Sequence, residues 1–265
     1  MKNIFSSKIY LLILSIVSIN AFSEDIKNVE NVMIERYSTK ALFRPSIMPT
    51  GMFSVASNAT MNTNKSNINW NVGSTFGIVK DLQGSASYDG LEFNEFAVSR
   101  TINLGLKYNY SSINHLSTSV SLGLPIHIAH KDKSVITDIN FGLPAVIYND
   151  MLAGGILHDL FTLTVKPTIA CAFNFPLWIG TQVYENLWAD VSTSFGKIEM
   201  TNEKNQAEWK NVGFWKELPL KLNVLYAINH YFDVSANIGL KDAMKAKETL
   251  HFGLGVEFRG GKIFG

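Results

Sequence analysis

Residues 249–258 read T-L-H-F-G-L-G-V-E-F, and apolar residues alternate with polar or small residues through this stretch without a break. Side chains of an extended chain point to opposite faces in turn, so the stretch predicts a β-strand with one apolar and one polar face. The apolar set is Leu250, Phe252, Leu254, Val256 and Phe258. A soluble sandwich turns such a face inward and a membrane barrel turns it outward, so the alternation alone leaves both architectures open.

Four residues of this strand carry a further signal. His251, Gly253, Val256 and Phe258 follow the spacing polar-x-Gly-x-x-apolar-x-aromatic. The spacing resembles the C-terminal assembly signal of Gram-negative outer-membrane β-barrel proteins, a broad porin-like class. It departs from the usual pattern in one respect, because residues 259–265 follow the aromatic residue. The resemblance implies a location in the outer membrane and a barrel-assembly machinery as partner during biogenesis.

The start of the chain has the features of a secretory signal peptide. Lys2 and Lys8 precede an apolar run at residues 9–19, and a small-residue cleavage site ends at Ser23. These features predict a signal peptide over residues 1–23. The apolar run is shorter than the ~20 residues that a membrane-spanning helix needs. We therefore expect the chain to be exported across the inner membrane.

The composition argues against several classes of protein. Only 17% of the 265 residues are charged, which is low for a soluble domain. The net charge of +1 argues against a nucleic-acid partner, which would require a basic surface. No later apolar run approaches ~18 residues, so no transmembrane helix is predicted. The single cysteine, Cys171, cannot form an internal disulfide, and a sheet closed on itself is one way to hold an exported fold without disulfides.

Alternation with a period of two recurs along the chain and predicts an all-β fold, an antiparallel transmembrane β-barrel over residues 46–258. About twelve strands are predicted, at residues 46–56, 68–78, 85–98, 101–110, 117–128, 138–145, 163–171, 176–184, 187–196, 218–226, 232–241 and 249–258. Ten strands remain if the two least regular, 46–56 and 85–98, do not form, since bacterial barrels have even numbers. Residues 259–265 are predicted as a C-terminal tail.

Other segments are predicted to lie outside the strands. Residues 24–45 carry apolar residues at helical spacing and form either a short helix that plugs the lumen or a periplasmic segment. Residues 58–67 and 201–217 are polar and are predicted as long loops. Residues 149–160 are predicted as a short helix capped by the asparagine at its start. Pro167 cannot donate to a β-ladder and interrupts one predicted strand.

Charge is confined to one face of the predicted strands. A Lys or Arg facing lipid at mid-bilayer costs about 2 to 4 kcal/mol, so the uncharged face is predicted to meet outer-membrane lipid and the other to line the lumen. The candidate lumen-facing residues are Asn71, Lys107, Asn109, Asp138, Asn140, Lys166, Asp190, Lys221, Asn223, Asp233, Lys241 and Glu257. Short turns and longer loops are predicted to alternate, with the short turns in the periplasm. The strand ends beside them carry aromatic residues at positions 108, 110, 226, 232 and 258.

The sequence shows no recognisable catalytic, cofactor-binding or metal-binding pattern. Residues 73–77 read G-S-T-F-G, which lacks the central serine of a nucleophile elbow and lies in a predicted strand. There is no H-E-x-x-H, cysteine pair or phosphate loop. His127 and His130 are three apart, a spacing that puts them on opposite faces of a strand and disfavours a shared metal ion. We therefore expect a protein that needs no cofactor and is not an enzyme.

The function predicted from these features is a porin-like channel. Eight strands enclose only side chains and sixteen to eighteen leave an open channel, so about twelve predict a narrow lumen for small polar solutes. The candidate lumen residues mix lysines with carboxylates, so no ion selectivity is assigned. Two alternatives stay open. One is a barrel enzyme that acts on lipid through a Ser-His pair assembled in space, and the other is a closed barrel that binds an external partner through its loops.

Overall fold

The computed structural model describes residues 37–63, 68–92, 100–113, 115–128, 135–136, 138–157, 160–164, 170–203, 206–211, 218–245 and 249–261. The predicted signal peptide, most of the predicted N-terminal helix, Lys166 and His130 lie outside these residues. Within the described ranges no helix is both long and apolar enough to span a membrane.

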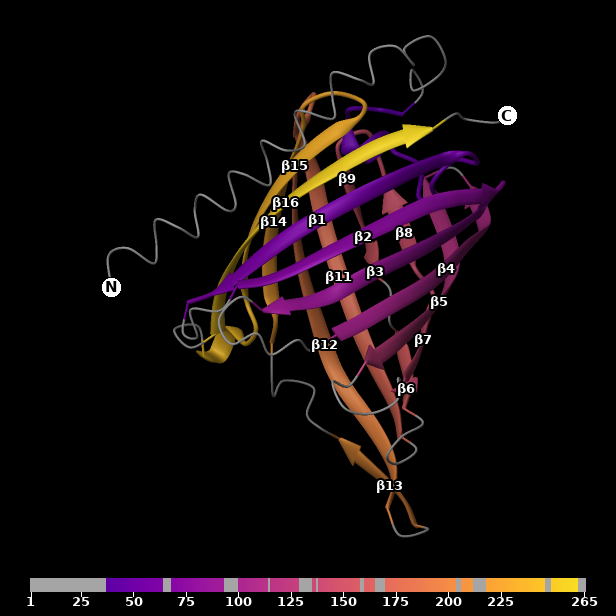
Figure 1. Ribbon diagram of the computed structural model, residues 1–265, viewed down its shortest axis with the longest axis vertical. Helices are drawn as coiled ribbons and strands as arrows, with labels where there is room; N and C mark the ends of the chain where they lie inside the picture. The colour runs from indigo at the N-terminus through magenta and orange to yellow at the C-terminus, as the bar shows by residue number, and fades with distance from the viewer. Residues whose placement is uncertain are drawn as a thin grey trace. The chain divides into compact units, whose positions relative to one another are not determined.

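The described chain from residue 37 onward forms one antiparallel sheet that closes into a barrel (Figure 1). Its strands are β1 (Met52–Asn62), β2 (Ile68–Val79), β3 (Leu82–Glu92), β4 (Arg100–Ile113), β5 (Leu116–Ile128), β6 (Val135–Ile136), β7 (Asp138–Gly142), β8 (Ala145–Tyr148), β9 (Leu152–Ile156), β10 (Phe161–Thr164), β11 (Ala170–Tyr184), β12 (Leu187–Glu203), β13 (Gln206–Asn211), β14 (Leu220–Ala227), β15 (Phe232–Leu240) and β16 (Leu250–Gly261). Two short 3-10 helices, η2 (Ala41–Phe43) and η3 (Ala243–Lys245), accompany them.

The barrel wall has twelve strand positions. β7 and β8 both pair with β5, so together they fill one position, and β10 and β9 fill the next because both pair with β11. β6 and β13 are additional strands that extend the edges of β5 and β12. The wall closes where β1 pairs with β16, from Met52 opposite Gly261 to Asn62 opposite His251. The predicted twelve-stranded barrel is confirmed, and the alternative with ten strands is wrong.

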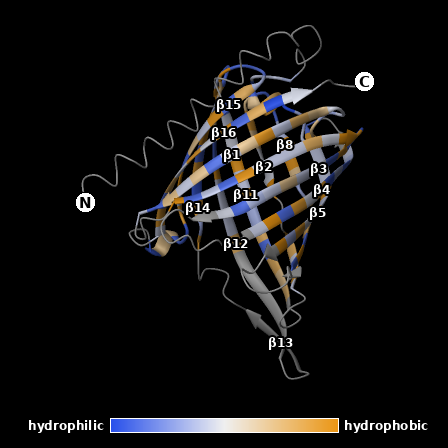
Figure 2. Cartoon of the chain, viewed as in Figure 1, coloured by the Kyte–Doolittle hydropathy of each residue, from blue (hydrophilic) through white to orange (hydrophobic). Residues whose placement is uncertain are grey.

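The apolar face of the strands points away from the barrel interior. Leu104, Leu106 and Tyr108 of β4 keep 43, 48 and 50% of their surface exposed. On the other face Ser119 is 2% and Asp233 is 1% exposed. Figure 2 shows hydrophobic and hydrophilic residues alternating along the strands. An exposed apolar wall around a polar interior is the arrangement of a barrel in lipid.

The tight turns gather at one end of the barrel. The β2–β3 turn has Asp81 at φ 63° and the β4–β5 turn has His115 at φ 65°, left-handed conformations that such turns require. Strand direction places the turns after β8, β11 and β14 at the same end, together with the start of β1 and the finish of β16. We call this the short-turn end and the opposite one the long-loop end.

The predicted helix at residues 149–160 is wrong. Asn149 Oδ1 accepts hydrogen bonds from the backbone N–H groups of Met151 at 2.9 Å and Leu152 at 2.7 Å, and this turn leads into strand β9 instead. The glycines inside the segment explain the difference, because a helix interior disfavours glycine whereas β9 needs it. A Cβ at Gly155 would overlap the backbone carbonyl oxygen of Ala145 on β8.

Two strand boundaries near the N-terminus also differ from the prediction. β1 begins at Met52 rather than at residue 46 and continues to Asn62, so the first five residues of the predicted loop at 58–67 belong to the strand. In the second half of β1, outward residues such as Ala59 are only weakly apolar, so the alternation of apolar and polar residues is hard to see in the sequence. The predicted strand at 85–98 forms as β3, which covers Leu82–Glu92.

Three further corrections concern strand ends. The predicted strand at 163–171 is two strands, since Leu163 of β10 lies opposite Cys171 of β11; Pro167, outside the described residues, separates them. The predicted loop at 201–217 is largely a hairpin, because Glu203 of β12 pairs with Gln206 of β13. β16 runs to Gly261, beyond the predicted end of the barrel at Phe258.

The facing of the strands can be tested at two neighbouring residues of β5. Val120 is 43% exposed on the apolar face, and Ser121 lies opposite Lys107 on the polar face. In a variant whose native cysteine carries the Cys171→Ala change, we expect brominated lipid to quench a fluorophore on Val120→Cys and to spare one on Ser121→Cys. Fluorescence in reconstituted vesicles measures this. Equal quenching at the two positions would contradict the facing.

Candidate functional site

The segment before β1 turns into the barrel at its short-turn end. Residues 37–51, here called the inner segment, contact lumen-facing side chains of strands around the wall. The segment contains two prolines, Pro45 and Pro49, which suit an irregular path because they cannot donate to a ladder. Its one regular piece is the single turn η2. The structure thus places residues 37–51 inside the lumen. For residues 24–45 the sequence left two alternatives open, a helix that plugs the lumen and a periplasmic segment.

Side chains of the wall satisfy the backbone of the inner segment. Gln83 Oε1 on β3 accepts the N–H of Met48 at 2.7 Å, and Gln182 Oε1 on β11 accepts the N–H of Leu42 at 3.3 Å. The Nζ of Lys107 on β4 donates to the carbonyl oxygen of Ser46 at 2.7 Å. Buried backbone groups must be paired, so these contacts fix the path of the segment across the lumen.

Close packing against β2 completes this path. A Cβ at Gly77 would overlap the carbonyl oxygen of Pro49, so only glycine lets the inner segment approach the wall here. The N–H of Gly51 donates to the carbonyl oxygen of Gly77 at 3.2 Å. On β5, the hydroxyl of Ser117 lies 2.9 Å from that of Ser46. The inner segment therefore contacts strands around the wall, from β15 through β11, β5, β4 and β3 to β2. It narrows the lumen at the short-turn end.

One side of the constriction is apolar. Leu42 is 8% exposed and packs against Ala153 of β9 and Trp188 of β12. Trp178 and Trp188 stack edge to face with ring centroids 6.2 Å apart. Leu225 of β14 adds to the same cluster. Burying a leucine side chain contributes roughly 1.5 to 3 kcal/mol, so Leu42 anchors the middle of the inner segment.

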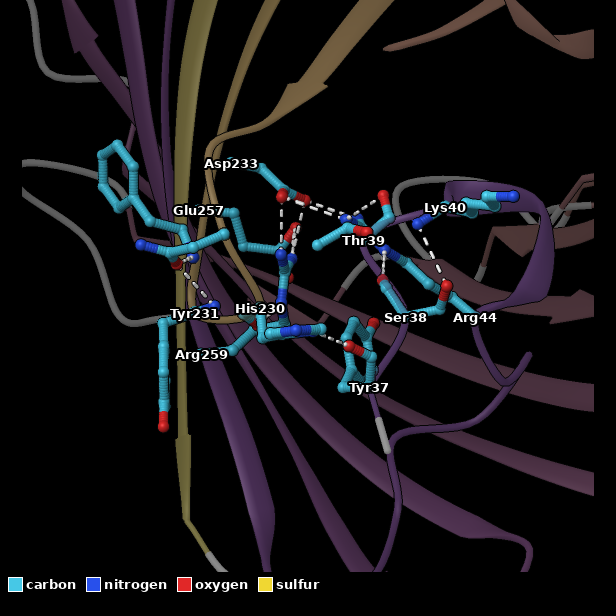
Figure 3. Close-up of polar contacts among 12 residues, drawn as sticks. Tyr37, Ser38, Thr39, Lys40, Arg44, His230, Tyr231, Asp233, Glu257 and Arg259 are labelled. Atoms are coloured by element: carbon cyan, nitrogen blue, oxygen red, sulfur yellow. Dashed lines mark hydrogen bonds and ion pairs between the residues drawn. The ribbon is translucent and has the colours of Figure 1, made fainter. Parts of the chain in front are cut away.

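The other side of the constriction is a cluster of charges (Figure 3). Asp233 of β15 binds two arginines: Arg44 of the inner segment at 2.5 and 3.0 Å, and Arg259 of β16 at 2.7 and 2.6 Å. Glu257 lies 3.4 Å from Arg259. The ring of Tyr37 faces both guanidinium groups, 5.4 Å from Arg44 and 4.8 Å from Arg259.

Burial makes this cluster sensitive to loss of the carboxylate that the two arginines share. Arg259 is 0% and Asp233 1% exposed, so each charge needs its partners to offset the cost of leaving water. Burial raises the pKa of Tyr37, and the two arginines act in the opposite direction. The phenol is therefore neutral at physiological pH. His230 Nδ1 lies 2.7 Å from the carbonyl oxygen of Tyr37 and ties the start of the inner segment to the β14–β15 turn.

The structure brings some of the predicted lumen residues together and separates others. Lys107, Asp233 and Glu257 belong to the constriction just described. Asp190 accepts hydrogen bonds from Trp188 Nε1 at 2.9 Å and Asn223 Nδ2 at 3.0 Å.

The remaining predicted residues lie elsewhere on the wall. Asn71 is opposite Asn58 in the ladder, and Asn140 is opposite Gly123. Asp138 accepts a hydrogen bond from Thr164 at 2.7 Å. Asn109 lies opposite Ser119 on β5, and Lys221 and Lys241 line a hollow at the long-loop end.

The sequence predicted Lys107 and Asp233 but missed other residues that hold the inner segment, Arg44 and Arg259 among them. Arg44 lies in a segment without strand periodicity, and its partner Asp233 is 189 residues away. Arg259 was assigned to the tail because the assembly signal normally ends at its aromatic residue. One signal was available, since Arg259 stands two residues after Glu257 and therefore on the same face of an extended strand. In the described part of the chain, no group of three His, Cys, Asp or Glu residues is arranged to hold a metal ion.

Comparison with known proteins identifies the fold. No family model matches the chain, and no curated protein matches it in sequence. The barrel superimposes on the NanC porin with a TM-score of 0.55 and 8% identity over 77% of this chain and 98% of that one. The chain therefore has the β-barrel fold of outer-membrane porins.

Other outer-membrane barrels give weaker matches. A KdgM porin in complex with disordered oligogalacturonate matches with a TM-score of 0.49 and 9% identity, over 77% of this chain and 98% of that one. An outer-membrane channel from Pseudomonas putida F1 matches with a TM-score of 0.47 and 9% identity, over 82% of this chain and 99% of that one.

The charge cluster makes an asymmetric prediction about stability. Asp233→Asn leaves Arg259 buried with only the more distant Glu257 as acidic partner, and breaking a buried pair in this way costs roughly 3 to 5 kcal/mol. Arg44→Ala leaves the Asp233–Arg259 pair intact and should cost much less. The temperature at which the folded form disappears in heat-modifiability electrophoresis measures both. Equal losses for the two variants would contradict this asymmetry, and no loss in either would show that the cluster does not stabilise the barrel.

Proposed function

We propose that this barrel is a narrow channel for small polar solutes. The observation that carries the proposal is the contrast between its two faces: an exposed apolar wall outside, and an interior wall of amides, hydroxyls and charges. Cross-strand amide pairs, Asn58 with Asn71 and Asn223 with Asn237, stand on that interior wall. Such groups exchange hydrogen bonds with water and with polar solutes, whereas an apolar interior would exclude both.

The inner segment sets the width of the proposed channel. It crosses the short-turn end and contacts strands from β15 round to β2, so a solute must pass beside it. Twelve strands already predict a lumen narrower than that of a sixteen-stranded porin. We therefore propose small solutes, passing singly, rather than polymers with bulky side groups.

A second candidate function is a closed barrel that binds an external partner. The contacts of the inner segment favour closure, and β13 extends β12 as a hairpin of six paired positions beyond the end of β14 (Figure 1). In this alternative the hairpin at the long-loop end would be the binding surface. The two candidates differ in one measurable property, because only the channel conducts ions.

The proposal also excludes chemistry on lipid. We propose that the protein is not an enzyme and that it needs no cofactor. Purified protein refolded into phospholipid should leave the lipid intact over hours, as shown by thin-layer chromatography of the extract. Release of lysophospholipid at a rate proportional to protein concentration would replace the channel by the lipid-enzyme alternative.

Planar-bilayer recording tests the channel and the role of the inner segment together. We expect discrete conductance steps from the refolded protein, and steps several-fold larger after deletion of residues 38–50. Gly77→Ala should also enlarge the steps, because its Cβ displaces Pro49 from the wall. Gly123→Ala is the matched control, since its Cβ would make an ordinary 3.4 Å contact with the Cβ of Asn140.

Each outcome of this recording decides between the candidates. Absence of steps from the wild type over many insertions, with steps after the deletion, supports the closed barrel. Absence of steps from both removes the channel. Steps of equal size from all four proteins leave the channel in place and show that the inner segment does not limit it. Heat-modifiability electrophoresis confirms beforehand that each variant is folded.

A further inference from the structure

The long-loop end of the lumen contains a hollow of about 490 Å³ with a distinctive lining. This volume lies within the range of roughly 300 to 1,000 Å³ that small-molecule sites occupy. Its polar lining includes Thr60, Asn62, Asn69, Lys221, Lys241 and His251. Among the described lining residues there are two lysines and a histidine but no carboxylate.

Lys221 and His251 lie on strands that have one strand between them, and the residue that separates the two in the ladder is a glycine. In the ladder Lys221 of β14 lies opposite Gly239 of β15, which lies opposite His251 of β16, which lies opposite Asn62 of β1. A Cβ at Gly239 would overlap the His251 ring, so this ring leans over the glycine toward Lys221. Strands are ~4.8 Å apart, so the backbones of Lys221 and His251 are about 10 Å apart. The His251 ring thus occupies the space that a side chain at position 239 would take.

The lysines of the hollow are not neutralised by the described part of the chain. Neither Lys221 nor Lys241 forms an ion pair with any described carboxylate. Asp242, next to Lys241, is 4% exposed and accepts hydrogen bonds from the N–H groups of Leu218 at 3.4 Å and Met244 at 3.0 Å. Its carboxylate is therefore occupied by backbone N–H groups of its own loop and of the segment before β14.

The acidic groups of this half of the lumen stand on other strands. Asp89 of β3 accepts a hydrogen bond from Asn103 at 2.5 Å, and Asp138 of β7 accepts one from Thr164 at 2.7 Å. The basic groups therefore stand on β14, on β16 and just after β15, away from Asp89 and Asp138. Asp190 of β12 stands nearer to Lys221, and its carboxylate accepts hydrogen bonds from Trp188 and Asn223. An anion is drawn to the basic wall by this arrangement.

One further atom in the hollow is ready for a ligand. Asn69 Oδ1 is buried and has no hydrogen-bond partner in the described part of the chain. A buried polar atom without a partner is unfavourable, and a donor on a ligand or a water recovers that loss. Asn69 thus complements the lysines, because they attract an anionic group while its amide oxygen can accept a hydrogen bond from a hydroxyl.

We infer that this hollow is a binding site for small oxyanions, solutes that carry a carboxylate or phosphate group, at the long-loop entrance. The inference rests on the proposed channel and names the solute class that it would select. Lys221 and Lys241 bind the anionic group, His251 packs over Gly239 and shapes the site, and Asn69 accepts a hydrogen bond from the ligand. Bound oxyanion then occupies the path of chloride through the lumen.

Inorganic phosphate is the probe for this site. In planar bilayers under a KCl gradient, the reversal potential of the wild type should indicate preference for chloride over potassium, and phosphate added on the long-loop side should block the current. Lys221→Gln should raise the half-blocking phosphate concentration about tenfold, the effect of losing one charge-assisted hydrogen bond. Lys241→Gln should act in the same direction, and its reversal potential should move toward that of an unselective pore.

Lys80→Gln is the matched control. Lys80 is exposed in the β2–β3 turn at the opposite end, so this variant makes the same change in net charge far from the hollow. Phosphate block and reversal potential should remain at wild-type values. All variants must first show the heat-modifiable folded form.

The outcomes separate the site from the channel. A wild type that conducts without preference for chloride, or a Lys221→Gln variant blocked like the wild type, overturns the oxyanion site and leaves the channel standing. A wild type that does not conduct overturns the channel, and isothermal titration of the refolded protein with phosphate then decides on the site alone. Binding heat that Lys221→Gln abolishes supports the site, and no binding heat from the wild type removes it.

Discussion

The pairing of β1 with β16 is the constraint on which the rest of the structure depends. No water reaches the hydrocarbon core, so a sheet edge there would leave backbone groups unpaired at several kcal/mol each. Eleven residue pairs between the two strands remove that edge. The inward glycines of β16 make this possible. A Cβ at Gly255 would overlap Asn58 Oδ1, and one at Gly253 would lie 2.7 Å from Asn237 Oδ1. Small residues on the closing strand therefore accept the amide side chains of both neighbours.

The same closure positions the inner segment. β1 follows it directly, so its last residues must enter the lumen beside β2, where Gly77 leaves room. Its first residues are held by the closing strand itself, because Asp233 of β15 joins Arg44 to Arg259 of β16. The segment is thus fixed at both ends by the strands that close the barrel. A change that weakens the seam also loosens the constriction, and the ion pair couples the two.

The sequence predicted the strand number because lipid imposes an apolar outer face, and this was clearest at 101–110, 117–128 and 232–241. The predicted boundaries of β1 were wrong because its outer face is weakly apolar at Ala59. The helix predicted at 149–160 was wrong because Gly155 allows two strands to pack closely rather than forming a turn. The polar residues of the lumen were predicted as a set. Their partners were not, because a link such as Arg44 to Asp233 joins residues 189 apart in a chain whose closure brings its two ends together. The period of two predicts on which side of the sheet a residue lies and contains no information about which distant residue it pairs with.

The effect of the lumen charges on a solute depends on where the barrel places them. In sequence the lysines and carboxylates alternate along the chain and no selectivity follows. In the structure the constriction combines Lys107, Arg44 and Arg259 with Asp233 and Glu257, and three cations against two carboxylates leave one positive charge. The hollow at the other end adds two lysines without a described acidic partner. The acidic groups between them accept hydrogen bonds from amide, hydroxyl and indole donors, which partly offset their potential. Water and salt screen charges beyond about 8 to 10 Å, so a solute responds to the nearest groups rather than to the net charge of the chain. Among the described residues, the constriction and the hollow therefore each carry more basic than acidic side chains.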